Sequence, residues 1–205
     1  MEEEEEELTC AAAYAQLKQA WVNERCSPDI LPFEVECVRT LKDSIDQREE
    51  ELAALDTKTV NEDQATIVEA VRLELQRVRF LLKSYLRERV RKLLRHPRHY
   101  LDETGEWYSY LCDAELDLLA DYARLTELTM DHSVLGRLPQ RYRKLPKKAH
   151  TEPDITEHVF IRMLRDVREH RFSNESTATL DAGDVWIARY DQVHSLIKAG
   201  DAHFA

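Results

Sequence analysis

Along the first two thirds of the chain, apolar residues recur at spacings of three and four, which places them on one face of a helix. A first helix is expected after Thr9, whose side chain can cap a helix N-terminus, and it must end by Pro28. Its apolar stripe consists of Tyr14, Leu17 and Trp21, with Ala20 beside them. A second helix is expected just after Pro32. Its stripe consists of Val38, Leu41, Ile45, Leu52 and Leu55, and a polar connection follows over 56–63.

The strongest periodicity predicts a long third helix over residues 64–95, which at about 1.5 Å per residue would exceed 40 Å. Its main stripe consists of Val68, Val71, Leu75, Val78, Leu82 and Tyr85. Leu73, Phe80, Leu81 and Leu86 lie off that stripe, so we expect cover on several sides, with another chain as one source of it. After a break between Pro97 and Gly105, a fourth helix is expected with Asp113 as its N-cap. Its two apolar rows are Leu116, Leu119, Ala123 and Met130, and Leu118, Tyr122 and Leu125.

The composition changes after residue 132. Residues 133–153 contain three prolines and six basic residues, with no acidic residue before Glu152, which is typical of an interdomain linker. The segments 158–164 and 185–190 then predict strands, 191–199 a short helix closed by Gly200, and 203–205 a terminal strand. We therefore expect a mainly α chain. A four-helix, largely antiparallel domain over 9–132 would precede a small β-rich C-terminal domain over 154–205 that needs support from a partner surface.

The net charge of -11 argues against general coating of nucleic acid, which requires a basic surface. Apolar runs stay far below the roughly 20 residues of a transmembrane helix, so no membrane contact is expected. The acidic run Glu2–Glu7 is unlike a signal peptide and predicts an acidic disordered tail over residues 1–8. The four cysteines, at positions 10, 26, 37 and 112, fit neither a metal knuckle nor a disulfide framework. They indicate reduced thiols in a cytosolic or nuclear protein.

The sequence carries no phosphate-binding loop, nucleophile elbow or HExxH motif. His96 and His99 have an HxxH spacing, but Pro97 breaks the helix that would aim them, so a solvated helix end is preferred over a zinc site. Acidic pairs at helical spacing are expected by chance among 40 acidic residues. We therefore expect no catalytic residue, metal or cofactor and no enzymatic activity.

Basic residues gather in two segments of this acidic chain. Residues 83–98 contain seven basic residues and one acidic residue, and residues 137–148 contain six basic residues and no acidic one. The candidate contact residues are Lys83, Arg87, Arg91, Lys92, Arg95, Arg141, Arg143, Lys144, Lys147 and Lys148. They indicate a DNA-binding accessory module or contact with an acidic protein surface. Alternatively, they complement a helix dipole and keep a linker in solution. Aromatic residues for base stacking are sparse, so DNA contact is an alternative and not a requirement.

Strings in three parts of the chain occur in one order over residues 9–205. The first part contains AWVNER at 20–25, PDIL at 28–31 and ECV at 36–38. The long helix contains LQRVRFLLKSYLR at 75–87, an arginine-flanked apolar run. The last part contains Pro153-Asp154, VFIR at 159–162 and Arg189-Tyr190, followed by Val193, Leu196 and Gly200. In this order the strings resemble the Sld-five subunit family of the GINS DNA replication complex.

The resemblance implies a helical domain followed by a small β-rich domain, in a non-catalytic structural subunit of a heterotetramer. Its partners would be three other GINS subunits. Through the complex it would also contact the MCM ring and the Cdc-forty-five protein, forming the active replicative DNA helicase for initiation and elongation. The resemblance also implies a nuclear location.

Two groups of residues are candidates for packing between subunits or domains. Tyr14, Leu17, Trp21, Phe80, Leu81 and Leu86 are subunit-interface candidates, with the core of this chain as the equal alternative. Phe160, Trp186 and Tyr190 are expected in the core of the small domain, with docking to a neighbour as the alternative.

Overall fold

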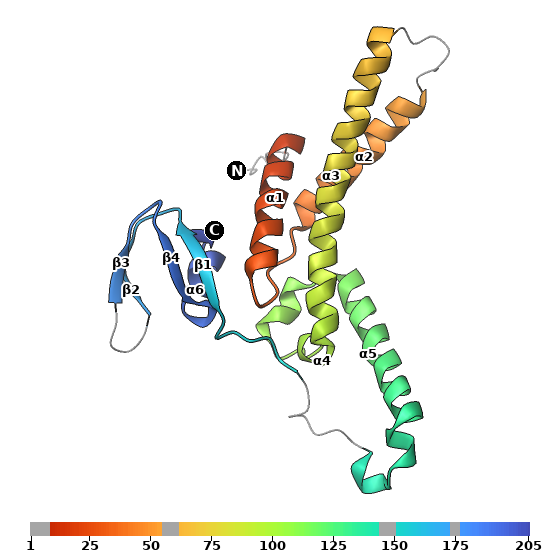
Figure 1. Cartoon of the computed structure of the whole chain (residues 1–205), viewed down its shortest axis with the longest axis vertical. Helices are drawn as coiled ribbons and strands as arrows, with labels where there is room; N and C mark the ends of the chain where they lie inside the picture. Colours follow the sequence, from red (N-terminus) through yellow and green to blue (C-terminus); the bar gives the residue numbers. More distant parts are fainter. Residues whose placement is uncertain (1–8, 55–61, 144–150, 173–176) are drawn as a thin grey trace, which may run out of the picture. The chain divides into compact units, whose positions relative to one another are not determined.

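The structure is a computed structural model that describes residues 9–54, 62–143, 151–172 and 177–205 (Figure 1). The chain is mainly helical and its strands lie near the C-terminus, which confirms the expected fold class. The helices are α1 (Cys10–Cys26), α2 (Val35–Ala54), α3 (Glu62–Arg95), α4 (Pro97–Tyr100), α5 (Asp113–Ser133) and α6 (Tyr190–Lys198). Short 3-10 helices are η1 (Glu106–Tyr110), η2 (Leu135–Arg137) and η3 (Gln140–Tyr142). The strands are β1 (His158–Met163), β2 (Val167–Arg171), β3 (Thr177–Leu180), β4 (Val185–Arg189) and β5 (Ala202–Phe204).

Two compact units make up the chain, and the division between them falls within α1 and α3. The first unit contains α1 as far as Trp21, then α2, and α3 as far as Arg87. The second contains Val22–Phe33 and Glu88–Ala205. The predicted acidic tail, Leu55 and residues 56–61 of the predicted connection lie outside the described residues.

The first unit buries one or two residues of each predicted apolar stripe, and the other described stripe residues are half-buried. Thr9 Oγ1 accepts a hydrogen bond from the Ala12 N–H at 3.4 Å, so Thr9 caps α1 as expected. The buried side chains are Ala13 and Leu17 of α1, Cys37, Leu41 and Ile45 of α2, and Leu81 and Tyr85 of α3. The Tyr85 hydroxyl accepts a hydrogen bond from the Glu34 N–H at 3.2 Å, which ties the start of α2 to the middle of α3. The spacing of four along α2 is what brings its three buried residues onto one face.

In the second unit, the last turns of α3 pack with α4 and α5. Their core consists of Ile30, Leu93, Tyr100 and Leu119. α5 begins at Asp113, but its N-cap is Cys112, one residue before the predicted cap. The Cys112 side chain accepts from the backbone N–H of Glu115, and the Glu115 carboxylate accepts from the Cys112 N–H at 3.2 Å. This reciprocal pair satisfies two N–H groups that a helix start otherwise leaves unpaired.

The small C-terminal domain contains a three-stranded antiparallel sheet in the order β4-β1-β5, with α6 beside it (Figure 1). β1, β4 and α6 occur where the sequence predicted them, and Gly200 closes α6 at φ +72°. The hairpin β2–β3 was not predicted. Its first strand reads VREHR and has no fully buried residue, and its second strand buries only Leu180, so neither strand carries a clear apolar alternation.

Residues of its own chain support the small domain. Leu31, from the segment after α1, is part of the apolar core that also holds Ile161, Val193 and Phe204. Asn23 Oδ1 accepts from the Phe204 N–H at 3.3 Å. Lys198 Nζ donates to the Glu106 carboxylate at 2.8 Å. Part of the supporting surface expected from a partner is therefore supplied by residues 23–31 and 106 of the same unit.

Candidate interaction surfaces

A buried arginine organises the second unit. Arg89 of α3 donates from Nε and Nη2 to the two carboxylate oxygens of Glu115 at 2.7 and 3.0 Å. Its Nη1 donates to Glu24 Oε2 at 3.2 Å and to the carbonyl oxygen of Leu31 at 2.6 Å. Nη2 also donates to the carbonyl oxygen of Tyr110 at 3.0 Å. All five guanidinium N–H donors are thus used, which compensates for the desolvation of the charge.

A second cation extends this ionic cluster. Lys92 Nζ donates to Glu24 Oε1 at 2.7 Å and to the carbonyl oxygen of Asp29 at 2.9 Å. Burial lowers the pKa of Lys92, and the Glu24 carboxylate opposes that shift. The Tyr100 hydroxyl donates to Asp29 Oδ1 at 2.9 Å, and burial raises the pKa of Tyr100. The cluster therefore fixes the 22–33 segment against α3, α4 and α5.

The ionic cluster was not predicted, although the sequence carries a signal for it. Arg89 follows Tyr85 at a spacing of four, so it continues the apolar stripe of α3. Glu24 likewise continues the α1 stripe, three residues after Trp21. A charged residue at the next position of an apolar stripe predicts a buried ion pair, because a charge on that face can be buried only with a partner.

The cluster also corrects part of the basic-segment hypothesis. Lys92 is only 16% exposed at its side chain and is bound to Glu24, so it is not available for contact with DNA. Arg91 is exposed and pairs with Glu88 at 3.0 Å within α3. The other candidates that are exposed are Lys83, Arg87, Arg95, Arg141 and Arg143. Lys144, Lys147 and Lys148 lie outside the described residues.

The subunit-interface candidates of the first unit differ in burial. Leu17 and Leu81 are fully or nearly fully buried in this chain, so they are core residues of the unit. Tyr14, Trp21 and Leu86 are half-buried, whereas Phe80 is 66% exposed. Phe80 and Leu73 of α3 line a groove of about 860 Å³ together with Tyr14 and Trp21 of α1. This groove offers apolar side chains to a partner.

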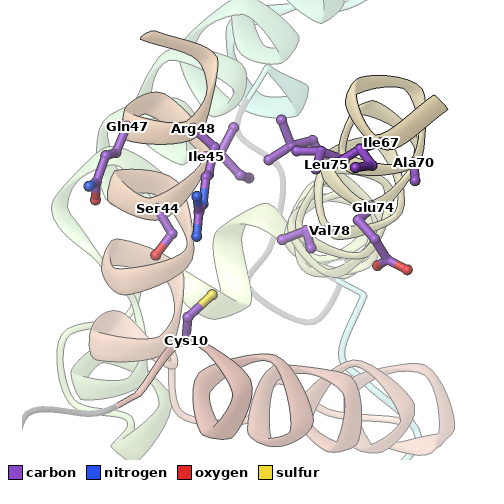
Figure 2. A pocket seen from close by; sticks show the side chains of 11 residues that line it. Cys10, Ser44, Ile45, Gln47, Arg48, Ile67, Ala70, Glu74, Leu75 and Val78 are labelled. Carbon is purple, nitrogen blue, oxygen red and sulfur yellow. The ribbon is translucent and has the colours of Figure 1, made fainter. Parts of the chain in front are cut away.

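A second groove of the first unit lies between α2 and α3 (Figure 2). It has a volume of about 580 Å³, and its lining is mostly apolar. Ile45 of α2 faces Leu75 and Val78 of α3 across it, with Cys10 of α1 at one end (Figure 2). Ile67, near the start of α3, is largely exposed at its edge. The two grooves leave the N-terminal half of α3 only partly covered by its own chain.

The C-terminal two thirds of α5 is largely exposed. From Ala120 to Ser133, only Ala123 and Thr126 are even half-buried. Its exposed apolar side chains are Leu118, Tyr122, Leu125, Leu128 and Met130. The row formed by Leu118, Tyr122 and Leu125 was predicted from the sequence, and it faces solvent in the chain alone. Contiguous apolar exposure of this kind is typical of a protein interface.

The aromatic candidates of the small domain occupy three different environments. Tyr190 is buried in the core, and burial raises its pKa to about 12. Trp186 packs at the margin of that core, stacked against Phe172 at 6.2 Å between ring centroids. Phe160 is 55% exposed, so its expected core position is wrong. β1 alternates strictly, and Val159 and Ile161 take the inward positions, which turns Phe160 outward.

The other candidate chemistry is structural where it is described. His99 stacks on Trp107 at 4.0 Å between ring centroids, and burial lowers the pKa of His99. Within the described residues, no group of three or more His, Cys, Asp or Glu side chains could hold a metal ion. All four cysteines are free thiols. No described helix is both long and apolar enough to cross a membrane.

These features define a helix-rich protein with a small strand-containing C-terminal domain and exposed apolar surfaces on two of its helices. Comparison with known proteins specifies the family. Residues 47–131 match the GINS complex protein helical bundle domain, and residues 153–204 match the C-terminus of DNA replication complex GINS protein SLD5.

Curated relatives match nearly the whole chain. DNA replication complex GINS protein sld5 of Schizosaccharomyces pombe is 31% identical over 194 residues, covering 91% of this chain and 89% of the relative. The SLD5 proteins of Chaetomium globosum and Homo sapiens are 31% and 28% identical, covering 91% and 96% of this chain and 87% and 91% of the relatives. The chain belongs to the SLD5 (Sld-five) family of DNA replication complex GINS proteins.

Proposed function

We propose that the chain is a non-catalytic structural subunit of a heterotetrameric GINS complex, with three other GINS subunits as partners. The observation that carries this proposal is the exposed apolar row of α5, in which Leu125 is 61% exposed. A helical segment of about 14 residues is marginal in water without packing, and the described part of this chain leaves residues 120–133 of α5 largely uncovered. A sister subunit would supply the missing cover.

Membership of the family supports a proposal about the wider role. Relatives of this chain are named as proteins of the DNA replication complex GINS. We propose that the assembled complex joins the MCM ring and the Cdc-forty-five protein to form the active replicative helicase for initiation and elongation, and that the chain works in the nucleus. The domain organisation is part of the same proposal. A helical domain over 9–132 and a small β-rich domain over 154–205, joined by a basic linker over 133–153, agree with family matches that end at residue 131 and resume at residue 153.

Native mass spectrometry tests the assembly. The chain is purified alone and after co-expression with the three other GINS-type subunits of its organism. We expect a one-to-one-to-one-to-one complex, and poor solubility or aggregation of the chain alone. A well-behaved monomer that ignores those three subunits would contradict the proposal.

The alternative, a DNA-binding accessory module, is less well supported. Arg89 and Lys92, in the middle of the first basic segment, are neutralised by Glu24 and Glu115 inside the unit. DNA affinity of the purified chain that falls steeply with salt concentration would favour the module.

A further inference from the structure

The outer face of the three-stranded sheet differs from the rest of this acidic chain. Register places Phe160 of β1 opposite Ile187 of β4, and Arg162 of β1 opposite Val185 of β4. Residues that pair across an antiparallel ladder lie on the same face of the sheet. We call these four residues, Phe160, Arg162, Val185 and Ile187, the outer sheet face.

The apolar members of this face are not covered by their own domain. Phe160 and Ile187 are 55% and 60% exposed, and Val185 is half-exposed. The inward side chains of the same strands, such as Val159 and Ile161, are buried in the domain core. Three large apolar side chains side by side on one exposed sheet face exceed the scattered single residues that a free surface normally shows.

The charge on this face is one-sided. The remaining outward positions of the three strands carry His158, Arg189 and His203, so no carboxylate occupies an outward register position of these described strands. Arg189 is held by Asp191 at 2.6 Å. Arg162 is exposed and lies next to the apolar side chains. Among the residues that the structure describes, it takes part in no ion pair. An exposed guanidinium beside apolar surface offers a bidentate site for a carboxylate.

We propose that the outer sheet face docks an acidic, apolar segment of a partner protein. Apolar side chains of that segment cover Phe160, Val185 and Ile187, and one of its Asp or Glu carboxylates accepts hydrogen bonds from the Arg162 guanidinium. Charge complementarity selects a carboxylate-bearing occupant. A protein is favoured over nucleic acid because only one of the three apolar side chains, that of Phe160, is aromatic and can stack on a base. The net charge of -11 also disfavours a polyphosphate partner.

Site-specific photo-crosslinking tests the docking. The full chain, with benzoylphenylalanine in place of Phe160, replaces the native protein in the cells of its organism. After irradiation, the crosslinked peptide is sequenced by mass spectrometry. The same probe in place of Thr179, an exposed residue of β3, is the matched control. We expect position 160 to crosslink to one protein segment that contains both carboxylates and apolar residues. Arg162→Glu should lower the crosslink yield at least tenfold, and Arg162→Lys, which keeps the charge but not the bidentate geometry, should give an intermediate yield.

Several results would overturn the inference. These are crosslinks at position 160 only within this chain, crosslinks to nucleic acid, crosslinks to segments without acidic residues, or a yield that Arg162→Glu leaves unchanged. The three other GINS subunits that co-purify are measured in the same cells before irradiation. Failure of the native chain to co-purify with those subunits would contradict the proposed function. Absence of the crosslink while the subunits still co-purify would contradict only the docking, so the two failures are distinguishable.

Discussion

Arg89 and Glu115 form a buried bidentate ion pair, with N–O distances of 2.7 and 3.0 Å, between the end of α3 and the first turn of α5. The same carboxylate caps α5 by accepting the Cys112 N–H. One contact therefore sets both where α5 starts and how it meets α3. Since Arg89 also binds Glu24, the pair belongs to a network that holds three segments of the second unit together.

Arg89→Met should destabilise the protein by about 3 to 5 kcal/mol, because it leaves the buried carboxylates of Glu24 and Glu115 without their main partner. Urea denaturation of the full chain, followed by circular dichroism, measures the free energy of unfolding. Arg91→Met is the matched control, since Arg91 lies two residues after Arg89 and is exposed. This change should lower the free energy of unfolding by no more than about 0.5 kcal/mol. Equal losses from the two variants would show that the network contributes no special stability.

The helices were predictable because their apolar stripes are long and regular, as in α3. The ionic cluster lay on those same stripes at Glu24 and Arg89, but the partners of a buried charge come from segments far apart in the sequence. The distances in sequence from Arg89 to Glu24 and to Glu115 do not indicate that these side chains are in contact.

The small domain shows a different limit. Successive residues of β1 alternate between inward and outward positions. If Val159 is taken as an inward position, this period of two already places Phe160 outward from the sequence alone. The hairpin β2–β3 was missed because its strands are short and bury only Leu180 fully, so few apolar residues mark them. A strand shows apolar alternation when it buries one whole face against the rest of its domain, and β2 and β3 bury little of theirs.

Tyr100→Phe should cost about 1 to 2 kcal/mol, because it removes the hydrogen bond from the buried hydroxyl to Asp29 Oδ1. The ring remains, so the change isolates the hydroxyl. Thermal unfolding of the two proteins gives the difference. Tyr122→Phe, on the exposed side of α5, should leave the midpoint unchanged, and an equal shift in both variants would refute the role of the Asp29 contact.

Stability should fall as the pH drops below about 6.5, the ordinary pKa of histidine, because burial lowers the pKa of His99 in the folded chain. At a pH between the folded and the unfolded pKa of His99, the imidazole binds a proton in the unfolded chain but not in the folded chain. The contribution of His99 is therefore fully present above the unfolded pKa and is lost as the pH falls toward the folded one. Urea midpoints at pH 7.5 and 5.5 measure the slope. His99→Phe, which keeps an aromatic ring against Trp107, should flatten it. His132→Phe, at an exposed position of α5, should not, and an unchanged slope in His99→Phe would contradict the assignment.

Gly200→Val should destabilise the small domain by about 1 to 2 kcal/mol, because Gly200 has φ +72° and a β-branched residue is strained there. Among the described residues, no atom lies within 4 Å of a Cβ placed at this position, so the loss reports mainly on the backbone angle. Gly200→Asn should cost less, since Asn tolerates the left-handed region. Urea unfolding followed by tryptophan fluorescence measures both variants, and equal losses would point to a cause other than the backbone angle.

Leu125→Glu should leave the fold of this chain intact and weaken the proposed GINS assembly by tenfold or more. Leu125 is 61% exposed on α5, so a carboxylate there contacts water in the free chain. In the complex, the same carboxylate would be buried against an apolar partner surface without a counter-charge. Circular dichroism of the free chain checks the fold, and native mass spectrometry of the co-expressed subunits checks assembly. Asp121→Glu, one turn earlier on α5 and exposed, preserves the charge and should assemble normally. Normal assembly of Leu125→Glu would remove α5 from the subunit interface, and the grooves beside α3 would then be the first surfaces to test.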